Sequence, residues 1–272
     1  MDLGTFGIWR RIGQLTEAMA VAAEELGYGA IWIGGSPPGD LDVVEMTLEA
    51  TEQIPVVTGI VNMWREDAST VARSYHRIVD KHPGRFLLGV GVGHPEATAG
   101  YRRPLDKIND YLDGLEKAGV PGDQIVLAAL GPKALGIAAE RTAGAHPYLT
   151  TPRHTAMARE IMGQGPLLAP EHKVILGADP ESFLEQGRAV VQRYLRLDNY
   201  RRNLRREGWD QADLADGGSD RLIRALVLGG GPAEVADALR AHIDAGADHV
   251  GIQALGEKPD EAYRLLAGAL LG

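Results

Sequence analysis

The fourth of eight β-rich runs in this 272-residue chain reads Arg85-Phe86-Leu87-Leu88-Gly89-Val90-Gly91-Val92-Gly93-His94. Successive side chains of a strand point to opposite faces of its sheet. The run therefore predicts a buried strand that, from Leu88 onward, carries Leu88, Val90 and Val92 on one face and Gly89, Gly91 and Gly93 on the other. The bare face either leaves room for a flat ligand or lets bulky neighbours fill the space. The run ends at His94, which is either a ligand contact or a structural histidine.

Seven further runs of this kind alternate with amphipathic stretches. They are Leu3–Ile8, Ala30–Ile33, Pro55–Ile60, Gln124–Ala129, Ala145–Leu149, Lys173–Leu176 and His249–Gln253. Apolar residues between the first two runs recur every three or four positions, the period of a helix that buries one face. Glycine, which suits a left-handed helix end, precedes a run at Gly27, Gly119, Gly144 and Gly246. Eight strand–helix units predict an α/β fold, a (β/α)8 TIM barrel. An open doubly wound sheet is the alternative, but its GxGxxG fingerprint is absent after the first run.

One stretch is longer than the other units. From Asp179-Pro180, a good helix start, about seventy residues precede the last run. We expect a helical insertion over about 180–230, with helices at Gly218–Leu228 and Pro232–Ala245 and a turn at Gly229–Gly231. Six arginines crowd the insertion: Arg193, Arg196, Arg201, Arg202, Arg205 and Arg206. They are either a solvated face paired with neighbouring acids or a site for a polyanionic ligand tail. No low-complexity linker divides the chain, so we predict a single domain over 1–272.

Composition excludes several functions. With 28 Lys and Arg against 37 Asp and Glu, the net charge is −9, which argues against broad binding to nucleic-acid phosphates. The absence of cysteine excludes disulfides, thiolate nucleophiles and cysteine-based zinc sites. The histidine spacing predicts no metal site. No run approaches the roughly 20 apolar residues of a membrane span, and no signal core is seen at the N-terminus, so we expect a cytoplasmic protein.

In such a barrel the site lies at the carboxyl ends of the strands. The third run ends in Thr58–Asn62, where glycine before β-branched residues indicates a bulge or a plain turn. The fifth run leads to Leu130-Gly131-Pro132, a helix start whose free N–H groups suit a phosphate, and the sixth ends at Thr150 and Thr151. These two ends predict a phosphate cradle, although helix capping accounts for part of Thr151. Few obvious acids or nucleophiles stand at these strand ends, which favours an enzyme whose organic cofactor carries the reactivity.

Five motifs, in this order, resemble one known family. They are Glu25–Trp32, Thr58–Asn62, Gly84–Gly93, Gly231–Ala236 and Asp244–His249. The chain resembles the luciferase-like monooxygenase superfamily, and within it the coenzyme F420-dependent (deazaflavin) oxidoreductases typical of actinobacteria.

The resemblance implies a barrel, often dimeric, that binds a deazaflavin or flavin at its mouth. A non-prolyl cis peptide that backs the cofactor ring would fall at Gly59-Ile60. The cofactor contacts it implies are Gly59, Ile60, Val61, Asn62, Gly91, Val92 and Gly93, with Leu130, Gly131, Thr150 and Thr151 at the phosphate. This chain has Gly35 and Ser36 where related enzymes carry an acid and a histidine, and His94 where many carry a glutamate. His94 is therefore the predicted catalytic residue.

The leading function is an F420-dependent oxidoreductase that transfers hydride between the cofactor and a small organic substrate. One alternative is a flavin mononucleotide (FMN) dependent monooxygenase, and another is a flavin- or deazaflavin-binding protein without turnover. Beyond the substrate and a second copy in a homodimer, we expect no nucleic-acid or membrane partner.

Overall fold

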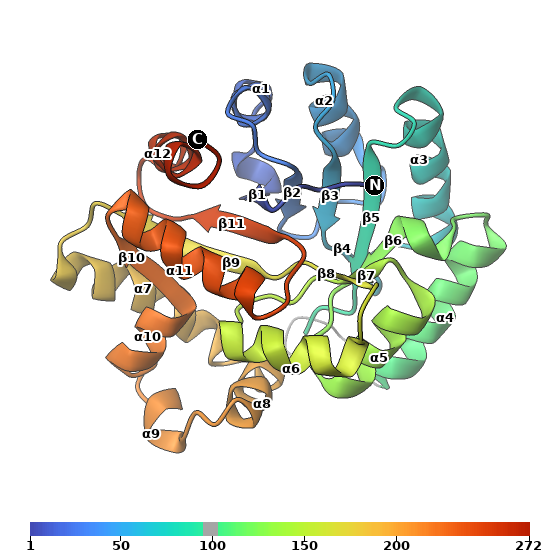
Figure 1. Cartoon of the computed structure of the whole chain (residues 1–272). Coiled ribbons are helices and arrows are strands. Elements are labelled where there is room, and N and C mark those ends of the chain that lie inside the picture. Colours follow the sequence, from blue (N-terminus) through green and yellow to red (C-terminus); the bar gives the residue numbers. More distant parts are fainter. Residues whose placement is uncertain (95–102) are drawn as a thin grey trace.

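The computed structural model describes residues 1–94 and 103–272, with parallel strands at the centre and helices around them (Figure 1). The strands are β1 (Phe6–Arg11), β2 (Ile31–Gly34), β3 (Val56–Gly59), β4 (Val61–Asn62), β5 (Phe86–Gly91), β6 (Ile125–Leu127), β7 (Gly144–Ala145), β8 (Leu167–Leu168), β9 (Glu171–Leu176), β10 (Val227–Gly230) and β11 (Val250–Ala254). The helices are α1 (Glu17–Glu25), α2 (Asp42–Ala50), α3 (Ala68–Lys81), α4 (Pro104–Lys117), α5 (Pro132–Arg141), α6 (Pro152–Met162), α7 (Pro180–Tyr194), α8 (Asp198–Arg206), α9 (Gln211–Leu214), α10 (Asp220–Leu226), α11 (Pro232–Asp244) and α12 (Pro259–Leu270). Among the described residues, no helix is long and apolar enough to cross a membrane.

The sheet closes where β8 runs into β9. The strands pair in the order β10-β9-β11-β1-β2-β3-β5-β6-β7-β8. Only Ala169 and Pro170 separate β8, at one end of this order, from β9, near the other end, so the two ends of the sheet meet there. There Ala169 N donates to Ala145 O, and Gly251 N donates to Pro170 O, both at 2.9 Å. If β3 with β4 and β8 with β9 are each taken as one stave, the closed ring of the described residues has eight staves, and β10 is a further strand that pairs only with β9. The predicted (β/α)8 barrel is confirmed.

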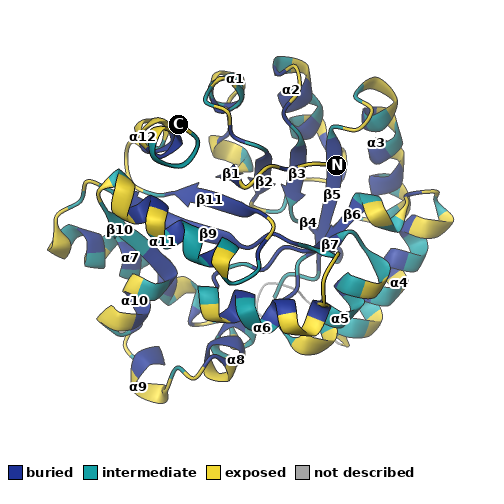
Figure 2. Cartoon of the chain, in the orientation of Figure 1, coloured by how far each residue is buried: buried dark blue, intermediate teal, exposed yellow. Residues whose placement is uncertain are grey.

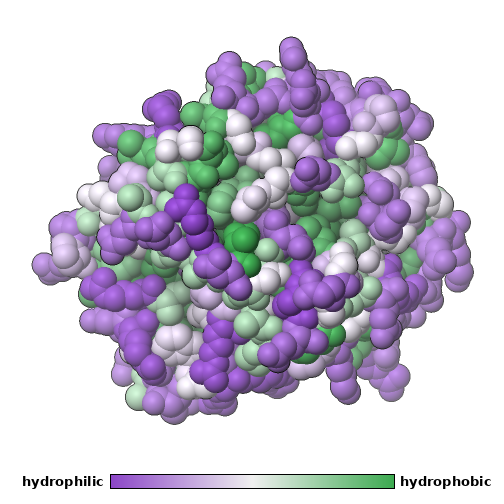
Figure 3. All heavy atoms as spheres, viewed as in Figure 1, coloured by the Kyte–Doolittle hydropathy of each residue, from purple (hydrophilic) through white to green (hydrophobic). Residues whose placement is uncertain are grey.

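Two layers of apolar side chains follow from strand alternation. Alternate residues such as Ile8, Ile31 and Val56 face outward and pack against the helices. The residues between them point into the barrel, where Trp9 and Trp32 are buried. Figure 2 shows most strand residues buried, with β10 largely intermediate, whereas the outer helix faces are exposed. Hydrophilic side chains accordingly cover most of the face seen in Figure 3.

Glycine junctions end several helices as predicted. Gly27, Gly119 and Gly246 adopt φ of +83°, +84° and +99°, a region that favours glycine. Asp179 caps α7 by accepting from the N–H groups of Glu181 and Ser182. These local signals therefore predicted the helix boundaries well.

The expectation for residues 218–231 is wrong in part. Helix α10 ends at Leu226, and residues 227–230 form strand β10 instead of a helix end and a turn. This strand pairs only with β9, at the end of the sheet path, and Gly229 lies against the ring of Phe183. A short, glycine-rich strand paired on one side carries little of the alternation that marks a strand.

The first and seventh runs were also misplaced. Strand β1 covers Phe6–Arg11, three residues later than expected, and β9 begins at Glu171. Both discrepancies involve charged residues, since Arg10, Arg11, Glu171 and Lys173 stand within strands. Charged side chains are rarely buried, so their presence argued against extending the predicted strands over these positions.

Candidate functional site

A cavity of about 560 Å³ opens at the carboxyl ends of the strands. Its lining includes residues at or just after the ends of β1, β2, β4, β5 and β6, together with the start of α4 and parts of α7 and α8. Of the predicted contacts, the lining contains Gly59, Ile60, Asn62, Val92, Gly93, His94, Leu130 and Gly131. The structure thus brings together most of the predicted residues from three separate chain segments.

The remaining predicted contacts, Val61, Gly91, Thr150 and Thr151, lie outside this lining. Val61 is fully buried and belongs to the outer core. Thr151 caps α6 by accepting from His154 N, and its hydroxyl donates to Glu207 at 2.6 Å. Thr150 is buried, and its Oγ1 has no hydrogen-bond partner among the described residues. The roles predicted for these four residues in ligand binding stay predictions.

The glycine face of β5 accommodates the neighbouring strand. A Cβ on Gly89 would lie 1.7 Å from Thr58 O, and one on Gly91 would lie 3.0 Å from the Ile60 side chain. At Gly89 and Gly91, neighbouring residues therefore fill the space beside the glycine, and no room for a flat ligand is left there. Gly93 alone of the three lines the cavity, at φ +60° and against the Asn62 amide.

The end of the third stave changes direction at Gly59-Ile60, whose peptide bond is cis. This is the bond that the resemblance implied. Gly59 faces Trp9 and His146, because a Cβ there would lie 2.9 Å from the indole Nε1 and 3.2 Å from the imidazole Nε2. The absence of a side chain at Gly59 is therefore required by this close approach.

His146 is held as a neutral imidazole below the cavity. Its Nδ1–H donates to Ala169 O at 2.6 Å, and its Nε2 accepts from Trp9 Nε1–H at 3.3 Å. Burial lowers the pKa of His146 to about 4, against the smaller opposing effect of its bond to Ala169. Both ring nitrogens are engaged, so His146 orients Trp9 and is no free base.

Aromatic rings form a continuous wall of the cavity, which we call the aromatic wall. Its members are Trp9, Tyr148, Tyr194, Tyr200 and His94, with neighbouring ring centroids 5.2–5.4 Å apart along this order. Tyr148 and Tyr194 share a hydrogen bond of 2.7 Å between their hydroxyls. Such a wall favours a ligand with a flat or apolar body. Sequence reasoning missed the three tyrosines, because two of them come from the insertion and none stands in a motif.

A fully buried ion pair supports the aromatic wall. Lys173 Nζ lies 2.9 Å from both carboxylate oxygens of Glu171 and 3.8 Å from the ring centroid of Tyr148. Glu171 also accepts from Leu149 N at 3.3 Å. Burial raises the pKa of Glu171, and Lys173 opposes that rise. Because neither side chain is exposed, the pair is structural, and it contacts the site through the rings of Tyr148 and Tyr194.

Four arginines line the cavity: Arg11, Arg65, Arg202 and Arg206. Within the described residues the lining contains no Asp or Glu. Arg206 lies over the N-terminus of α5, with Nη1 3.5 Å from the position of a Cβ on Gly131. The free N–H groups of a helix start and a guanidinium together attract a phosphate. Nearby, the Oδ1 of Asn199 is buried without a hydrogen-bond partner among the described residues.

Some arginines of the insertion line the cavity, as a ligand site would require, and others face solvent. Arg202 and Arg206 line the cavity, although Arg202 also pairs with Asp198. Arg205, on the same helix, donates instead to Gln211 at 2.6 Å. Helix α8 therefore presents some of its cations to the site and others to solvent.

Helix α8 is tied to the barrel through Glu207. This buried carboxylate accepts from Thr151 and, at 2.9 Å, from Asn203 Nδ2. Burial raises the pKa of Glu207 to about 7 despite these hydrogen bonds. The contact fixes α8, and with it Arg206, against the start of α6.

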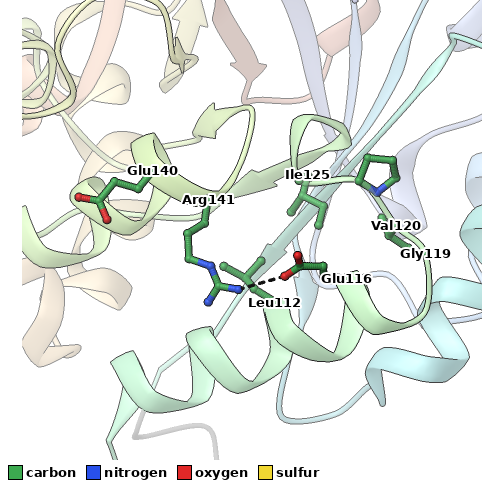
Figure 4. A pocket seen from close by; sticks show the side chains of 9 residues that line it. Leu112, Glu116, Gly119, Val120, Ile125, Glu140 and Arg141 are labelled. Atoms are coloured by element: carbon green, nitrogen blue, oxygen red, sulfur yellow. Dashed lines mark ion pairs between the residues drawn. The ribbon is translucent and has the colours of Figure 1, made fainter.

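No group of three or more His, Asp or Glu residues that could hold a metal ion occurs in the described part of the chain. A second cavity, of about 460 Å³, lies between α4 and α5 at the opposite end of β6 (Figure 4). There Arg141 is 2.6 Å from Asp113 and 3.7 Å from Glu116. Its cation is thus compensated by carboxylates.

The closed barrel, with a cavity at the carboxyl ends of its strands, defines a (β/α)8 protein. A family model described as luciferase-like monooxygenase matches residues 12–118, which confirms the resemblance. No match was found among curated protein sequences.

Solved structures share the fold over nearly the whole chain. An F420-dependent secondary alcohol dehydrogenase in complex with an F420-acetone adduct has a TM-score of 0.76 at 13% identity, with 98% of each chain covered. The coenzyme F420 dependent tetrahydromethanopterin reductase from Methanopyrus kandleri gives 0.73 at 16%, again with 98% of each covered. The oxygenating constituent of 3,6-diketocamphane monooxygenase from Pseudomonas putida, in complex with FMN, gives 0.70 at 15%, covering 99% of this chain and 98% of that one. These neighbours include both F420 and FMN enzymes.

Proposed function

We propose that the cavity binds coenzyme F420 and that the protein transfers hydride between this cofactor and a small organic substrate. One observation carries the proposal: four arginines and no carboxylate line the described cavity of a chain whose net charge is −9. Guanidinium groups beside a helix start, in a lining without carboxylates, suit a phosphorylated ligand.

The lining residues fit such a cofactor in two parts. The phosphate would be held by the N–H groups at the start of α5 and by Arg206, and the ring would lie against Gly59, Ile60 and Gly93. When bound, a deazaflavin gives or accepts hydride, the two-electron chemistry that these side chains lack.

Deazaflavin is preferred over FMN because of the insertion. The two cofactors share a ring system, a ribityl chain and the first phosphate, and only F420 continues into a polyanionic tail. Arg202 and Arg206 are exposed at the rim, on one face of α8, where such a tail would leave the cavity. An FMN-dependent monooxygenase is the alternative.

His94 is the proposed proton donor or acceptor. Hydride transfer to a carbonyl or imine leaves an anion that needs one proton, and the described lining holds no carboxylic acid to supply it. The imidazole of His146 is already engaged on both sides, which leaves His94 as the other imidazole of the lining. Replacing it with glutamine should lower kcat by roughly 10²–10⁴-fold while cofactor affinity stays within about twofold.

A parallel titration tests the cofactor assignment. Purified protein is titrated with F420 and with FMN at low and moderate salt, and binding is followed by cofactor fluorescence. F420 binding that is tighter than FMN binding and weakens with salt supports the proposal. Preference for FMN would move the protein to the oxygen-using alternative. Binding of neither would overturn the cofactor assignment, and tight binding without any substrate-dependent turnover would favour a binding protein.

A further inference from the structure

Two of the cavity arginines lie away from the proposed phosphate site. Arg11 is the last residue of β1, and Arg65 follows β4 by three residues. In the sheet register Arg11 stands opposite Gly34, and Gly34 stands opposite Gly59. The two arginines therefore belong to staves that flank β2, whereas Arg206 lies against the start of α5, which follows β6.

The direction of Arg11 follows from strand alternation. It shares its face of β1 with Trp9, which points into the barrel, so Arg11 continues that inner face to the mouth. Its Cβ lies 3.7 Å from the position that a Cβ on Gly35 would take. Arg11 and Gly35 thus stand side by side at the rim.

No acid neutralises this pair within the described residues. Neither Arg11 nor Arg65 forms an ion pair there. Glu66, the chain neighbour of Arg65, lies against Gly39, and Asp67 caps α3 by accepting from Ser69 and Thr70. Two exposed guanidiniums in a cavity lining without carboxylates form a site for an anion.

Ser36 adds a hydroxyl between the two arginines. It follows β2, the stave between those of Arg11 and Arg65, and it lines the cavity. Its φ of +57° is a backbone conformation that residues other than glycine rarely adopt. Such conformations cluster at functional sites, where the surrounding structure enforces them.

We infer that Arg11, Arg65 and Ser36 bind the carboxylate of the substrate, which is a small organic acid whose flat or apolar body packs on the aromatic wall. The inference rests on the proposed function, because it assigns the cation pair on α8 to the cofactor and leaves this pair to the substrate. Two guanidinium groups can each offer paired N–H donors to a carboxylate, and an amide of the same shape lacks the charge that strengthens these bonds.

Matched acids and amides test the inference by calorimetry. The full-length protein, alone and saturated with oxidised F420, is titrated with benzoate and benzamide, cinnamate and cinnamamide, and octanoate and octanamide. At least one acid should bind about tenfold more tightly than its amide. Arg11→Gln and Arg65→Gln should each reduce this preference below about threefold, and Ser36→Ala should reduce it less. Arg73→Gln, an exposed arginine of α3 outside the cavity lining, is the matched control and should retain the preference.

Three results would overturn the inference: no preference in any of the three pairs, a preference that survives both substitutions, or a loss of F420 affinity in Arg11→Gln and Arg65→Gln as large as in Arg206→Gln. In the last case these arginines hold the cofactor. Failure of the proposed function looks different, because the acids would then bind to a protein that binds neither F420 nor FMN.

Discussion

The two cavities of this barrel are similar in size and opposite in electrostatics. The cavity between α4 and α5 measures about 460 Å³, and its Arg141 is neutralised by Asp113 and Glu116. The cavity at the mouth measures about 560 Å³ and is lined by four arginines without a carboxylate among the described residues. The two cavities therefore differ in whether carboxylates neutralise their arginines, and they do not differ clearly in volume.

Compensation has a physical meaning. A cation that is paired with a carboxylate of the protein contributes to the fold, because its charge is already neutralised. A group of like charges without partners destabilises the fold slightly, and it persists where a ligand supplies the opposite charge. The comparison predicts that substitutions of paired charges change stability and substitutions of unpaired charges change binding.

The largest effect is expected at the buried pair beneath the mouth. Lys173→Met leaves the Glu171 carboxylate buried without its partner, which should lower the free energy of unfolding by about 3–5 kcal/mol in urea denaturation. The double variant Glu171→Leu/Lys173→Met removes both charges and should recover most of this loss. A single variant within about 1 kcal/mol of the original protein would contradict the assignment of the pair to the fold.

The pH dependence of the free energy of unfolding tests the neutral histidines inside the barrel. Burial lowers the pKa of His146 and of His249 to about 4, below the usual value near 6.5. The unfolded chain therefore binds more protons between these values, so the free energy of unfolding should fall as the pH drops from about 6.5 towards 4. Each histidine contributes up to about 3 kcal/mol to this loss.

The measurement is urea denaturation at pH 7, 6 and 5. His146→Asn and His249→Asn should each flatten the dependence. Glu207 acts in the opposite direction, because its raised pKa of about 7 makes its contribution fall as the pH rises from about 4.5 to 7. In Glu207→Gln the acid-side loss should therefore be steeper. Equal stability of the Glu207→Gln variant at pH 7 and pH 5 would contradict the neutral, buried histidines, because this variant lacks the opposing group.

Arg202 and Arg206 of α8 line the cavity, and the exposed pair between Arg202 and Asp198 contributes little to stability, so substitutions here should change binding more than stability. Arg202→Gln/Arg206→Gln should weaken F420 binding by roughly 10–100-fold, since charge-assisted hydrogen bonds contribute about 1.5–3 kcal/mol each, while the urea midpoint stays almost unchanged. Arg205→Gln, which removes an exposed arginine bound to Gln211, is the control and should bind F420 normally. Equal losses in both variants would show that only net charge matters.

The smallest effect is expected at the opposite cavity. Arg141→Gln removes a partly exposed ion pair and should cost no more than about 1 kcal/mol of unfolding free energy. Cofactor affinity, measured by the same fluorescence titration, should not change. A clear loss of affinity would break the comparison, because it would couple a compensated charge to the site at the other end of the barrel.

The fold was predictable in large part because its signals are local. Helix period, glycine ends and the Asp179 cap each depend on a few neighbouring residues. Strand β10 escaped prediction because it pairs on one side only, and the start of β9 escaped because Glu171 and Lys173 compensate each other in the interior.

The candidate site was predictable only where it follows strand ends. Gly59, Ile60, Gly93 and His94 stand at such ends and line the cavity. Tyr194, Tyr200 and Arg206 come from the insertion, and nothing in their sequence separates them from the neighbours that face solvent. The direction in which α8 presents its side chains depends on distant contacts such as that between Glu207 and Thr151.

The sequence by itself determined the repeating unit, the barrel and the position of its mouth, because hydrophobic period and glycine turns act over a few residues. Only the tertiary structure decided which charges are compensated. An arginine whose partner lies tens of residues away along the chain looks the same in sequence as one that has none, and the difference arises when the strands close and bring the segments together.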